Sequence, residues 1–446
     1  SDLELKQNFS EILPPYSRDE AVSEANRCLF CYDAPCIQAC PTHIDIPSFI
    51  NKIGTDNLRG SARVIMESNP LGCTCARVCP VEQLCEGACV LGEHHRPIHI
   101  GRLQRYATDW LLESGEMPYQ RGESTGRHIA VIGAGPAGLA CAMTLAQLGD
   151  YPVVFEAKSK GGGLDTYGIV SYREPTEIAL AEVGFAERLG IEFHYEAPIG
   201  AKVEAAVLLE KFDAVFIGVG LGEVPRLGIP GEELPGVVDA LEFIERTKTE
   251  ELSSIPIGRR VAVIGAGNTA VDAATASLRL GAEEVTIVYR RSAKEMPAYE
   301  FEFDFAKQEG IRFAWLTLPV RVIGEGAIEG LQCVRTKLGE KRDAKGRRQP
   351  EPIPGSEQIL PCDMVIKATG QSAVFGALAP LGFETKGNQI IVNPASGRTA
   401  NPKVFAAGDC TGADDDSTVV AAVEAGKKTA QAIHNLIPAP AKAARS

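Results

Sequence analysis

Residues 128–138 read His-Ile-Ala-Val-Ile-Gly-Ala-Gly-Pro-Ala-Gly, and the interpretation of the whole chain starts from them. The short apolar run predicts a buried strand that stops at the first glycine. The glycines follow the spacing G-x-G-x-x-G, which opens the helix of a dinucleotide-binding unit. Gly133 would make the tight turn, Gly135 would let a pyrophosphate approach the backbone, and Gly138 would let the helix close on the strand.

A second strand and an acid complete this unit. A helical run over 139–148 precedes an expected strand over 152–155, which ends at Glu156. An acid about 20 residues after the glycines accepts a hydrogen bond from a ribose hydroxyl. A lone G-x-G-x-x-G is a weak signal, but here strand, glycines, helix, strand and acid occur in order. The first nucleotide is expected to contact Gly133, Gly135, Pro136, Ala137, Gly138 and Glu156.

A second fingerprint begins at Val261. The strand over 261–264 leads into Gly-Ala-Gly-Asn-Thr-Ala at 265–270, where alanine replaces the third glycine, an allowed variant. The next strand ends in Arg290-Arg291 instead of an acid, and arginines suit a ribose 2′-phosphate. This pattern predicts a nicotinamide nucleotide, NADP(H) more than NAD(H), although a solvated basic turn is the plainer alternative. The expected contacts are Gly265, Gly267, Asn268, Thr269, Ala270, Arg290 and Arg291.

The two fingerprints together with Gly408-Asp409 resemble the two-dinucleotide flavoproteins, which bind FAD and a nicotinamide nucleotide. The resemblance implies that the glycine run over 161–163 approaches the FAD and that Asp409 meets its ribityl chain. A helix from about residue 418 to 433 would direct its N-terminus at the flavin, where the helix dipole favours negative charge. The further expected contacts are Gly162, Gly163, Leu164, Gly370, Gly408, Asp409, Thr418 and Val419.

Nine of the thirteen cysteines lie between residues 28 and 89. They form the groups Cys28-x2-Cys31-x4-Cys36-x3-Cys40-Pro and Cys73, Cys75, Cys79-Pro, Cys85, Cys89. Clustered thiolates ending in Cys-Pro are typical of iron–sulfur sites, and about eight ligands serve two [4Fe–4S] clusters. A disulfide scaffold would need an oxidising compartment, and structural zinc usually shows repeated Cys-x2-Cys knuckles. Both alternatives fit this array less well than iron–sulfur clusters do.

The cysteine array resembles a narrower group, the glutamate synthase small subunits and the dihydropyrimidine dehydrogenases. Residues 36–45, 69–85 and 98–104 are similar to the N-terminal part of dihydropyrimidine dehydrogenase. The resemblance covers essentially the whole chain and stops before any FMN barrel, as in the separate flavin subunit of the bacterial two-subunit enzyme. Residues 169–175, Ile-Val-Ser-Tyr-Arg-Glu-Pro, depart from the glutamate synthase pattern, which lowers that alternative without excluding it.

The resemblance also implies which residues hold the clusters. One cluster would be held by Cys28, Cys31, Cys36 and Cys89, and the other by Cys40, Cys79, Cys85 and Gln104. Cys75 matches a family cysteine that is not a ligand, and whether Gln104 or Cys75 completes the second cluster stays open. An amide oxygen in place of a thiolate would change the charge of that cluster and therefore its potential.

Composition bounds the remaining possibilities. The chain has 446 residues, 45% of them hydrophobic and 23% charged, as in soluble globular proteins. A net charge of −13 argues against a nucleic-acid-binding groove. No apolar run approaches the roughly 18 residues that a membrane span needs. The missing signal peptide and the need for free thiolates predict a reducing, cytoplasmic setting.

We therefore expect an α/β protein with an N-terminal helical iron–sulfur domain followed by two Rossmann-like dinucleotide-binding domains. The expected boundaries are 1–125 for the helical domain, 126–235 and 372–446 for the FAD-binding domain, and 236–371 for the NAD(P)H-binding domain. Apolar spacing predicts helix over 46–66 and 100–112, with little apolar core in the helical domain. Residues 337–348 are predicted to form an exposed hairpin.

These parts predict a subunit that passes hydride from NAD(P)H to FAD and single electrons onward through two clusters. Such transfer needs no acid–base pair, and we nominate no catalytic residue. The resemblance implies a hetero-oligomer, a heterotetramer, with an FMN- and iron–sulfur-containing catalytic subunit that reduces uracil or thymine. The alternatives are a glutamate synthase small subunit, a bifurcating ferredoxin:NADP oxidoreductase subunit, and a cluster-bearing redox sensor or scaffold.

Overall fold

The computed structural model describes residues 2–343, 346–412 and 417–439, and the chain divides into two compact units. The first unit consists of Ser1–Glu11, Tyr167–Tyr172 and Glu223–Ser372. The second unit consists of Ile12–Thr166, Arg173–Gly222 and Ala373–Ser446. Each unit contains a five-stranded sheet of parallel strands, so the predicted α/β class with two Rossmann-like parts is confirmed.

The second unit begins with helices. They are α2 (Arg18–Ala25), α3 (Pro35–Ala39), α4 (Ile46–Gly54), α5 (Leu58–Ser68), α6 (Gly72–Val78), the short η1 (Val90–Glu93) and α7 (Ile100–Ser114). The predicted helix over 46–66 is therefore two helices. Asp56 has a left-handed φ of 61°, and the Asn57 side chain accepts from Gly60 N at 2.9 Å to cap α5.

The prediction of little apolar core in this helical part was wrong. Phe49, Ile50 and Ile53 of α4 and Ile65 and Met66 of α5 are at most 1% exposed. These side chains belong to a core cluster that continues into the helices beside the second unit's parallel sheet. The helices therefore gain stability from apolar burial as well as from their cysteines.

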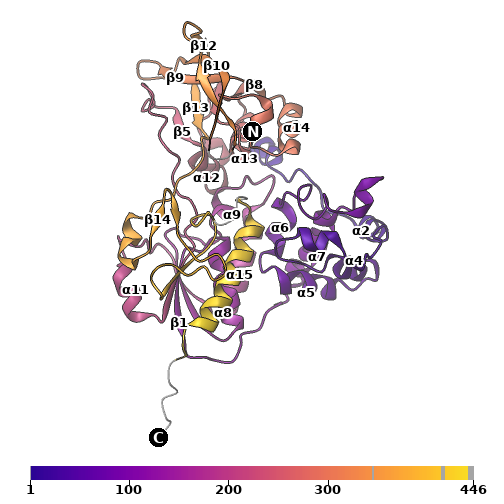
Figure 1. Ribbon diagram of the computed structural model, residues 1–446. Helices are drawn as coiled ribbons and strands as arrows, with labels where there is room; N and C mark the ends of the chain where they lie inside the picture. The colour runs from indigo at the N-terminus through magenta and orange to yellow at the C-terminus, as the bar shows by residue number, and fades with distance from the viewer. Residues whose placement is uncertain (1, 344–345, 413–416, 440–446) are drawn as a thin grey trace. The chain divides into compact units, whose positions relative to one another are not determined.

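The rest of the second unit is a dinucleotide-binding fold. Its elements are β1 (His128–Ile132), α8 (Pro136–Gln147), β2 (Tyr151–Phe155), α9 (Leu164–Tyr167), α10 (Thr176–Arg188), β3 (Glu192–His194), α11 (Ala205–Lys211), β4 (Ala214–Ile217), η4 (Gly376–Leu381), β14 (Thr385–Lys386), β15 (Gln389–Ile390), β16 (Val404–Ala406) and α15 (Val419–Leu436). The sheet order is β16-β4-β1-β2-β3, and Figure 1 shows α15 lying along α8. The strand β16 comes from far along the chain, so the fold closes only when the C-terminal segment returns.

The first unit repeats this plan with an added antiparallel sheet. Its elements are α1 (Asp2–Asn8), β5 (Val237–Asp239), α12 (Ala240–Thr249), η2 (Leu252–Ser254), β6 (Arg260–Ile264), α13 (Asn268–Leu280), β7 (Glu284–Val288), η3 (Ala293–Glu295), α14 (Glu300–Gln308), β8 (Arg312–Ala314), β9 (Thr317–Ile323), β10 (Gly330–Arg342), β11 (Arg348–Pro352), β12 (Gln358–Leu360) and β13 (Met364–Lys367). The parallel sheet has the order β5-β13-β6-β7-β8, and β10 pairs with β9, β11 and β12.

The division into units differs from the predicted boundaries in three stretches, and one of them is Tyr167–Tyr172, predicted within the FAD-binding domain but belonging to the first unit. The N-terminal residues belong to the first unit, where Phe9 packs on Tyr172 with ring centroids 6.1 Å apart. Residues 223–235 also belong there, because Glu232 lies 3.2 Å from Lys367 on β13 and Pro230 accepts from Val322 N at 2.9 Å. The helix and strand propensities of the sequence do not indicate these long-range contacts.

Within the described residues, no helix is both long and apolar enough to cross a membrane.

The contact between α8 and α15 gives a testable consequence. A Cβ on Gly426 of α15 would lie 2.3 Å from the carbonyl oxygen of Ala137, whereas one on Gly184 of α10 would meet nothing within 4 Å. Both alanine substitutions gain helix propensity, by up to about 1 kcal/mol. We expect Gly184→Ala to raise the melting temperature slightly, and Gly426→Ala to lower stability by about 1–3 kcal/mol through overpacking.

Thermal unfolding of the two variants, with bound flavin measured in parallel, checks this expectation. Equal melting temperatures for Gly426→Ala and Gly184→Ala would show that α15 can move away from α8 without cost. Loss of flavin from Gly426→Ala alone is expected, because the same contact adjoins the first glycine turn.

Candidate cofactor and nucleotide sites

The first glycine turn lies between β1 and α8 and leaves no space for side chains. Gly133 has φ +96°, and a Cβ on Gly138 would lie 1.9 Å from the carbonyl oxygen of Gly133. The glycine run that follows β2 lies against this turn, since Gly162 N donates to Ala134 O at 2.7 Å. A Cβ on Gly163 would lie 2.7 Å from Gly135 Cα. This bare backbone cradle fits the close approach of a dinucleotide.

The acid predicted for the ribose lies beside the same turn. The Glu156 carboxylate accepts from Ala134 N and from Lys158 N, each at 2.8 Å. Each carboxylate oxygen has a second lone pair, so these backbone contacts leave room for a hydroxyl donor. Glu156 thus positions the glycine turn as well as offering a ribose contact.

The C-terminal candidates reach the first turn from the other side. A Cβ on Gly408 would lie 3.0 Å from the Cβ of Ala137 in the first turn of α8. Asp409 follows directly, and Thr418 is the N-cap of α15, with its side chain accepting from Ala421 N at 3.3 Å. Val419 is the first residue of that helix. Segments far apart in sequence therefore surround one cradle, and its residues fit FAD.

The second glycine turn opens into a cavity of about 590 Å³ in the first unit, a usual size for a small-molecule site. Of the predicted contacts, those lining it are Gly265, Gly267, Thr269, Arg290, Arg291 and Gly370. Asn268 and Ala270 have other roles, because Asn268 Oδ1 accepts from Tyr299 N at 3.1 Å and Ala270 is fully buried. The sequence analysis missed Arg226 and Arg347, which also line the cavity.

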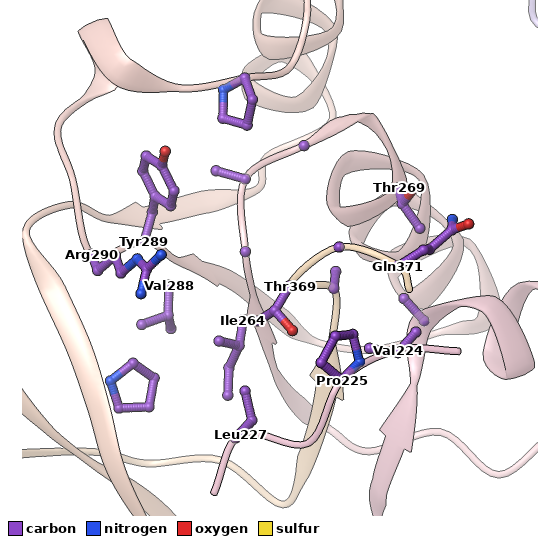
Figure 2. Close-up of a pocket in the computed structure, with 18 of the residues that line it drawn as sticks. Val224, Pro225, Leu227, Ile264, Thr269, Val288, Tyr289, Arg290, Thr369 and Gln371 are labelled. Atoms are coloured by element: carbon purple, nitrogen blue, oxygen red, sulfur yellow. The ribbon is translucent and has the colours of Figure 1, made fainter. Parts of the chain in front are cut away.

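The two neighbouring arginines behave differently. The guanidinium of Arg290 is exposed to the cavity, and Figure 2 shows it on the side opposite Thr269 and Gln371. Arg291 is 3% exposed, and its guanidinium donates to Asp343 and to the carbonyl of Arg348. Loss of hydration lowers the pKa of Arg290, and the nearby charges of Arg291 and Arg347 lower it too. An anion in the cavity would relieve this repulsion.

The first group of cysteines surrounds a mostly apolar cavity. Cys28, Cys31, Cys36 and Cys89 line it together with aliphatic side chains of α4 and of the loop before α7. Burial, followed by the neighbouring Cys28 and Cys89, raises the pKa of Cys36 to about 11. Thiols in such a place stay protonated unless a metal supplies positive charge. Four thiols around a dry pocket fit an iron–sulfur cluster.

The second group consists of Cys40, Cys79 and Cys85. Burial raises the pKa of Cys85, and the nearby Cys79 and Cys40 raise it further. Cys75 and Gln104 are the two candidates to complete the group. Cys75 hydrogen-bonds to Cys79, whereas Gln104 on α7 donates its amide nitrogen to Gly72 O at 2.8 Å, which fixes the orientation of the amide.

Among the described residues, no three side chains of histidine, cysteine, aspartate or glutamate converge closely enough to hold a single metal ion. A [4Fe–4S] cluster binds its ligands at separate iron atoms, so its thiolates surround a volume and need not converge on one point.

A buried carboxylate connects the cluster-bearing helices to the dinucleotide-binding part of the second unit. Glu182 of α10 is 1% exposed and accepts from Cys73 N at 2.7 Å and Thr74 N at 3.2 Å at the start of α6. Thr74 Oγ1 lies 2.6 Å from Glu182 Oε2 and 2.5 Å from Glu174 Oε1. A hydroxyl has one hydrogen, so Thr74 donates to one carboxyl group at a time, and the closeness of two buried carboxyl groups favours a proton on one of them.

Comparison with known proteins agrees with this architecture. Residues 5–116 match the family described as dihydropyrimidine dehydrogenase domain II, 4Fe–4S cluster. Residues 127–433 match the family described as pyridine nucleotide-disulphide oxidoreductase. The chain belongs to this pyridine nucleotide-disulphide oxidoreductase family. The prediction of a flavin and iron–sulfur oxidoreductase is confirmed, and its cofactors are [4Fe–4S] clusters, FAD and a pyridine nucleotide.

Two relatives from Escherichia coli are similar over nearly their whole length. The small chain of glutamate synthase [NADPH] is 37% identical, and the match covers 96% of this chain and 94% of the relative. The NAD-dependent dihydropyrimidine dehydrogenase subunit PreT is 36% identical, with 97% and 98% covered. Both names describe one chain of a larger enzyme.

Solved structures support the fold of the oxidoreductase part. Mycobacterium tuberculosis FprA in complex with NADPH has a TM-score of 0.57 and 21% identity, covering 69% of this chain and 84% of that one. Lactococcus lactis thioredoxin reductase has a TM-score of 0.53 and 22% identity, covering 70% of this chain and 99% of that one. At such identities the likeness establishes the fold alone.

Removing one thiol from the first group tests its assignment. We expect Cys89→Ala, in anaerobically purified protein, to lose about four of about eight iron atoms per chain and to keep its flavin. Cys141→Ala, a buried cysteine of α8, is the control and should keep all its iron. Iron, sulfide and flavin analysis makes the measurement, and zinc without sulfide in the parent would contradict the assignment.

The buried Glu182 predicts a pH dependence of stability. Burial raises the pKa of Glu182 to about 7, above its usual value of 4.5. Because the pKa is higher in the folded state, the stability that protonated Glu182 contributes is present below about pH 4.5 and is lost as pH rises to about 7. Replacing it with glutamine, which cannot ionise, should flatten this decline.

Melting temperatures of the cluster-loaded protein between about pH 5 and pH 8 measure the effect. Glu177→Gln changes an exposed carboxyl on the same helix and should leave the parent profile unchanged. Parallel profiles for the parent and Glu182→Gln would mean that the carboxyl does not ionise in this window.

Proposed function

We propose that this chain is the NAD(P)H-oxidising electron-transfer subunit of a dihydropyrimidine dehydrogenase-type enzyme. The observation that carries the proposal is the combination of two groups of thiols with an N-terminal match to dihydropyrimidine dehydrogenase domain II. PreT, a relative of almost equal length, bears the name of such a subunit. The partner proposed is an FMN- and iron–sulfur-containing catalytic subunit in a hetero-oligomer.

The protein's own part in the reaction is binding and positioning. The bare backbone at Gly135 and Gly163 admits one dinucleotide, and the cavity beside Gly265 and Gly267 admits the nicotinamide nucleotide. When bound, FAD would accept two electrons as hydride and release them singly to the clusters. We propose Cys28, Cys31, Cys36 and Cys89 as ligands of one cluster, and Cys40, Cys79, Cys85 and Gln104 as ligands of the other.

The nucleotide proposed is NADPH, and Arg290 supports it. Its guanidinium faces the cavity and, within the described part of the chain, has no hydrogen bond or ion pair to protein. A phosphate group is the natural partner of such a cation. The relative PreT is named as NAD-dependent, whereas the glutamate synthase relative is named for NADPH.

A glutamate synthase small subunit is the second candidate. The observation that favours it is the 37% identity to the glutamate synthase [NADPH] small chain over 96% of this chain. The two candidates share the same internal electron path and differ in the partner that receives the electrons. Only assays with both partners separate them.

The proposal predicts what the isolated chain does. With NADPH it should reduce artificial dyes through its flavin, and it should not reduce uracil or thymine. Addition of the FMN-containing subunit of a bacterial dihydropyrimidine dehydrogenase should make NADPH oxidation dependent on uracil. Cys85→Ala should lose this coupled activity and keep dye reduction, whereas Cys141→Ala should keep both.

Following NADPH absorbance in these mixtures decides the outcome. Uracil reduction by the chain alone would overturn the proposal. Glutamate formation with a glutamate synthase large subunit, and no activity with the pyrimidine-reducing partner, would establish the second candidate instead.

A further inference from the structure

The charged residues of the hairpin between β10 and β11 form ion pairs and hydrogen bonds with residues beside the nucleotide cavity. Arg291, three residues after β7, is buried and donates through Nε to Arg348 O at 2.8 Å. Its second contact is with the Asp343 carboxylate, at 2.9 Å. Arg348 in turn pairs with Glu295 of η3 at 2.9 Å. The base of the hairpin is therefore held against the edge of the nucleotide cavity.

The carboxylate of Asp343 also holds Arg347. Arg347 donates its backbone N–H to Asp343 Oδ1 at 2.9 Å and its Nε to Oδ2 at 3.0 Å. Asp343 thus lies between the buried Arg291 on one side and Arg347 on the other. Arg347 Nη2 also lies 3.0 Å from Oδ2, so three nitrogens of Arg347 contact one carboxylate, which limits the directions in which its guanidinium can point.

Arg347 lines the same cavity as Arg290, although the two residues are far apart in sequence. Arg347 is about one-third exposed, so its guanidinium is only partly surrounded by protein. The guanidinium groups of Arg290 and Arg347 repel each other, Asp343 offsets part of this repulsion, and an anion bound in the cavity would offset more of it. Arg291 differs from both because it is 3% exposed and donates to Asp343 and to the hairpin backbone, whereas Arg347, which Asp343 also pairs, keeps part of its guanidinium accessible.

We propose that Arg347 is, together with Arg290, a specificity-determining residue that contacts the 2′-phosphate of NADPH, and that Arg291 and Asp343 position it. This inference rests on the proposed NADPH preference and deepens it. It replaces the expected pair of adjacent arginines with one arginine from β7's end and one from the hairpin. Arg291 is then a positioning residue, and its own guanidinium does not reach the phosphate.

Binding of adenosine 2′,5′-bisphosphate and of 5′-AMP to the holoprotein tests the inference directly. The two probes differ only in the 2′-phosphate, and isothermal titration measures both without turnover. Arg347→Ala and Arg290→Ala should each weaken the bisphosphate about 10–100-fold and leave 5′-AMP within about two-fold. Arg348→Ala is the matched control, because Arg348 lies on the same hairpin, pairs with Glu295, and is not among the described residues that line the cavity.

The positioning role has its own readout. Asp343→Asn should weaken the bisphosphate less than Arg347→Ala does, and adding it to Arg347→Ala should cause no further loss. In steady-state assays with a dye acceptor, Arg347→Ala should raise KM for NADPH, keep kcat, and leave NADH unaffected. A general disturbance of the fold would instead weaken 5′-AMP and lower the melting temperature.

The two probes and the variants separate failure of the Arg347 role from failure of the NADPH preference. If Arg290→Ala loses the bisphosphate selectively and Arg347→Ala does not, the inference is wrong and the NADPH preference stands. If the parent binds both probes equally, the NADPH preference and the inference fail together. Equal selective losses in Arg347→Ala and the control Arg348→Ala would also overturn it, because the effect would then belong to the hairpin as a whole.

Discussion

The buried contact between Glu182 and the start of α6 is the constraint on which the second unit depends. The carboxylate accepts from the backbone of Cys73 and Thr74, so it fixes the helix that leads to Cys75 and Cys79. A charge in so dry a place is expensive unless it is well hydrogen-bonded. The hydrogen bonds from Cys73 and Thr74 offset part of that cost. The part that they do not offset raises the pKa of Glu182. One carboxylate thereby connects the cysteine-bearing helices to α10 of the dinucleotide-binding fold.

The same contact affects the electrostatic surroundings of the cysteines. Thr74 Oγ1 touches both Glu182 and Glu174, and both carboxyl groups are fully buried. A single hydroxyl hydrogen cannot serve two carboxylates at once, so this closeness favours a proton on the pair below about pH 7. A neutralised pair near the cysteines adds less negative charge to their surroundings than two ionised acids would. Burial, hydrogen bonding and net charge near a cluster are the quantities that tune its potential.

The two units share a glycine turn between a strand and a helix, and they differ in the segments that surround this turn. In both, a parallel strand ends in a glycine turn that opens a helix, and neighbouring strands supply the floor of the site. In the second unit, returning segments with Gly163 and Gly408 close on the turn. In the first unit, the antiparallel sheet adds a wall that carries arginine. The turn leaves bare backbone where a pyrophosphate can approach, and the added wall brings further arginine to the cavity.

The sequence by itself determined the features that are local in the chain. Gly133, Gly138 and Gly265 could be read directly, because a strand-to-helix turn without space for a Cβ is encoded within a few residues. The fold class and the cofactor classes follow from such turns and from clustered cysteines, and both were predicted correctly. The cysteines' division into two groups came from resemblance, since spacing does not say which thiols meet in space.

Only the tertiary structure decided the features that depend on distant segments. The buried core of α4 and α5, the place of residues 223–235, and the contact of Glu182 with α6 are all long-range contacts. The pair Arg290-Arg291 is the clearest case. Both residues follow β7 and both line the cavity, but Arg291 is 3% exposed and donates to the hairpin, whereas Arg290 is exposed. The sequence supplied two identical charges, and the partner Asp343, some fifty residues later, decided which of them stays available.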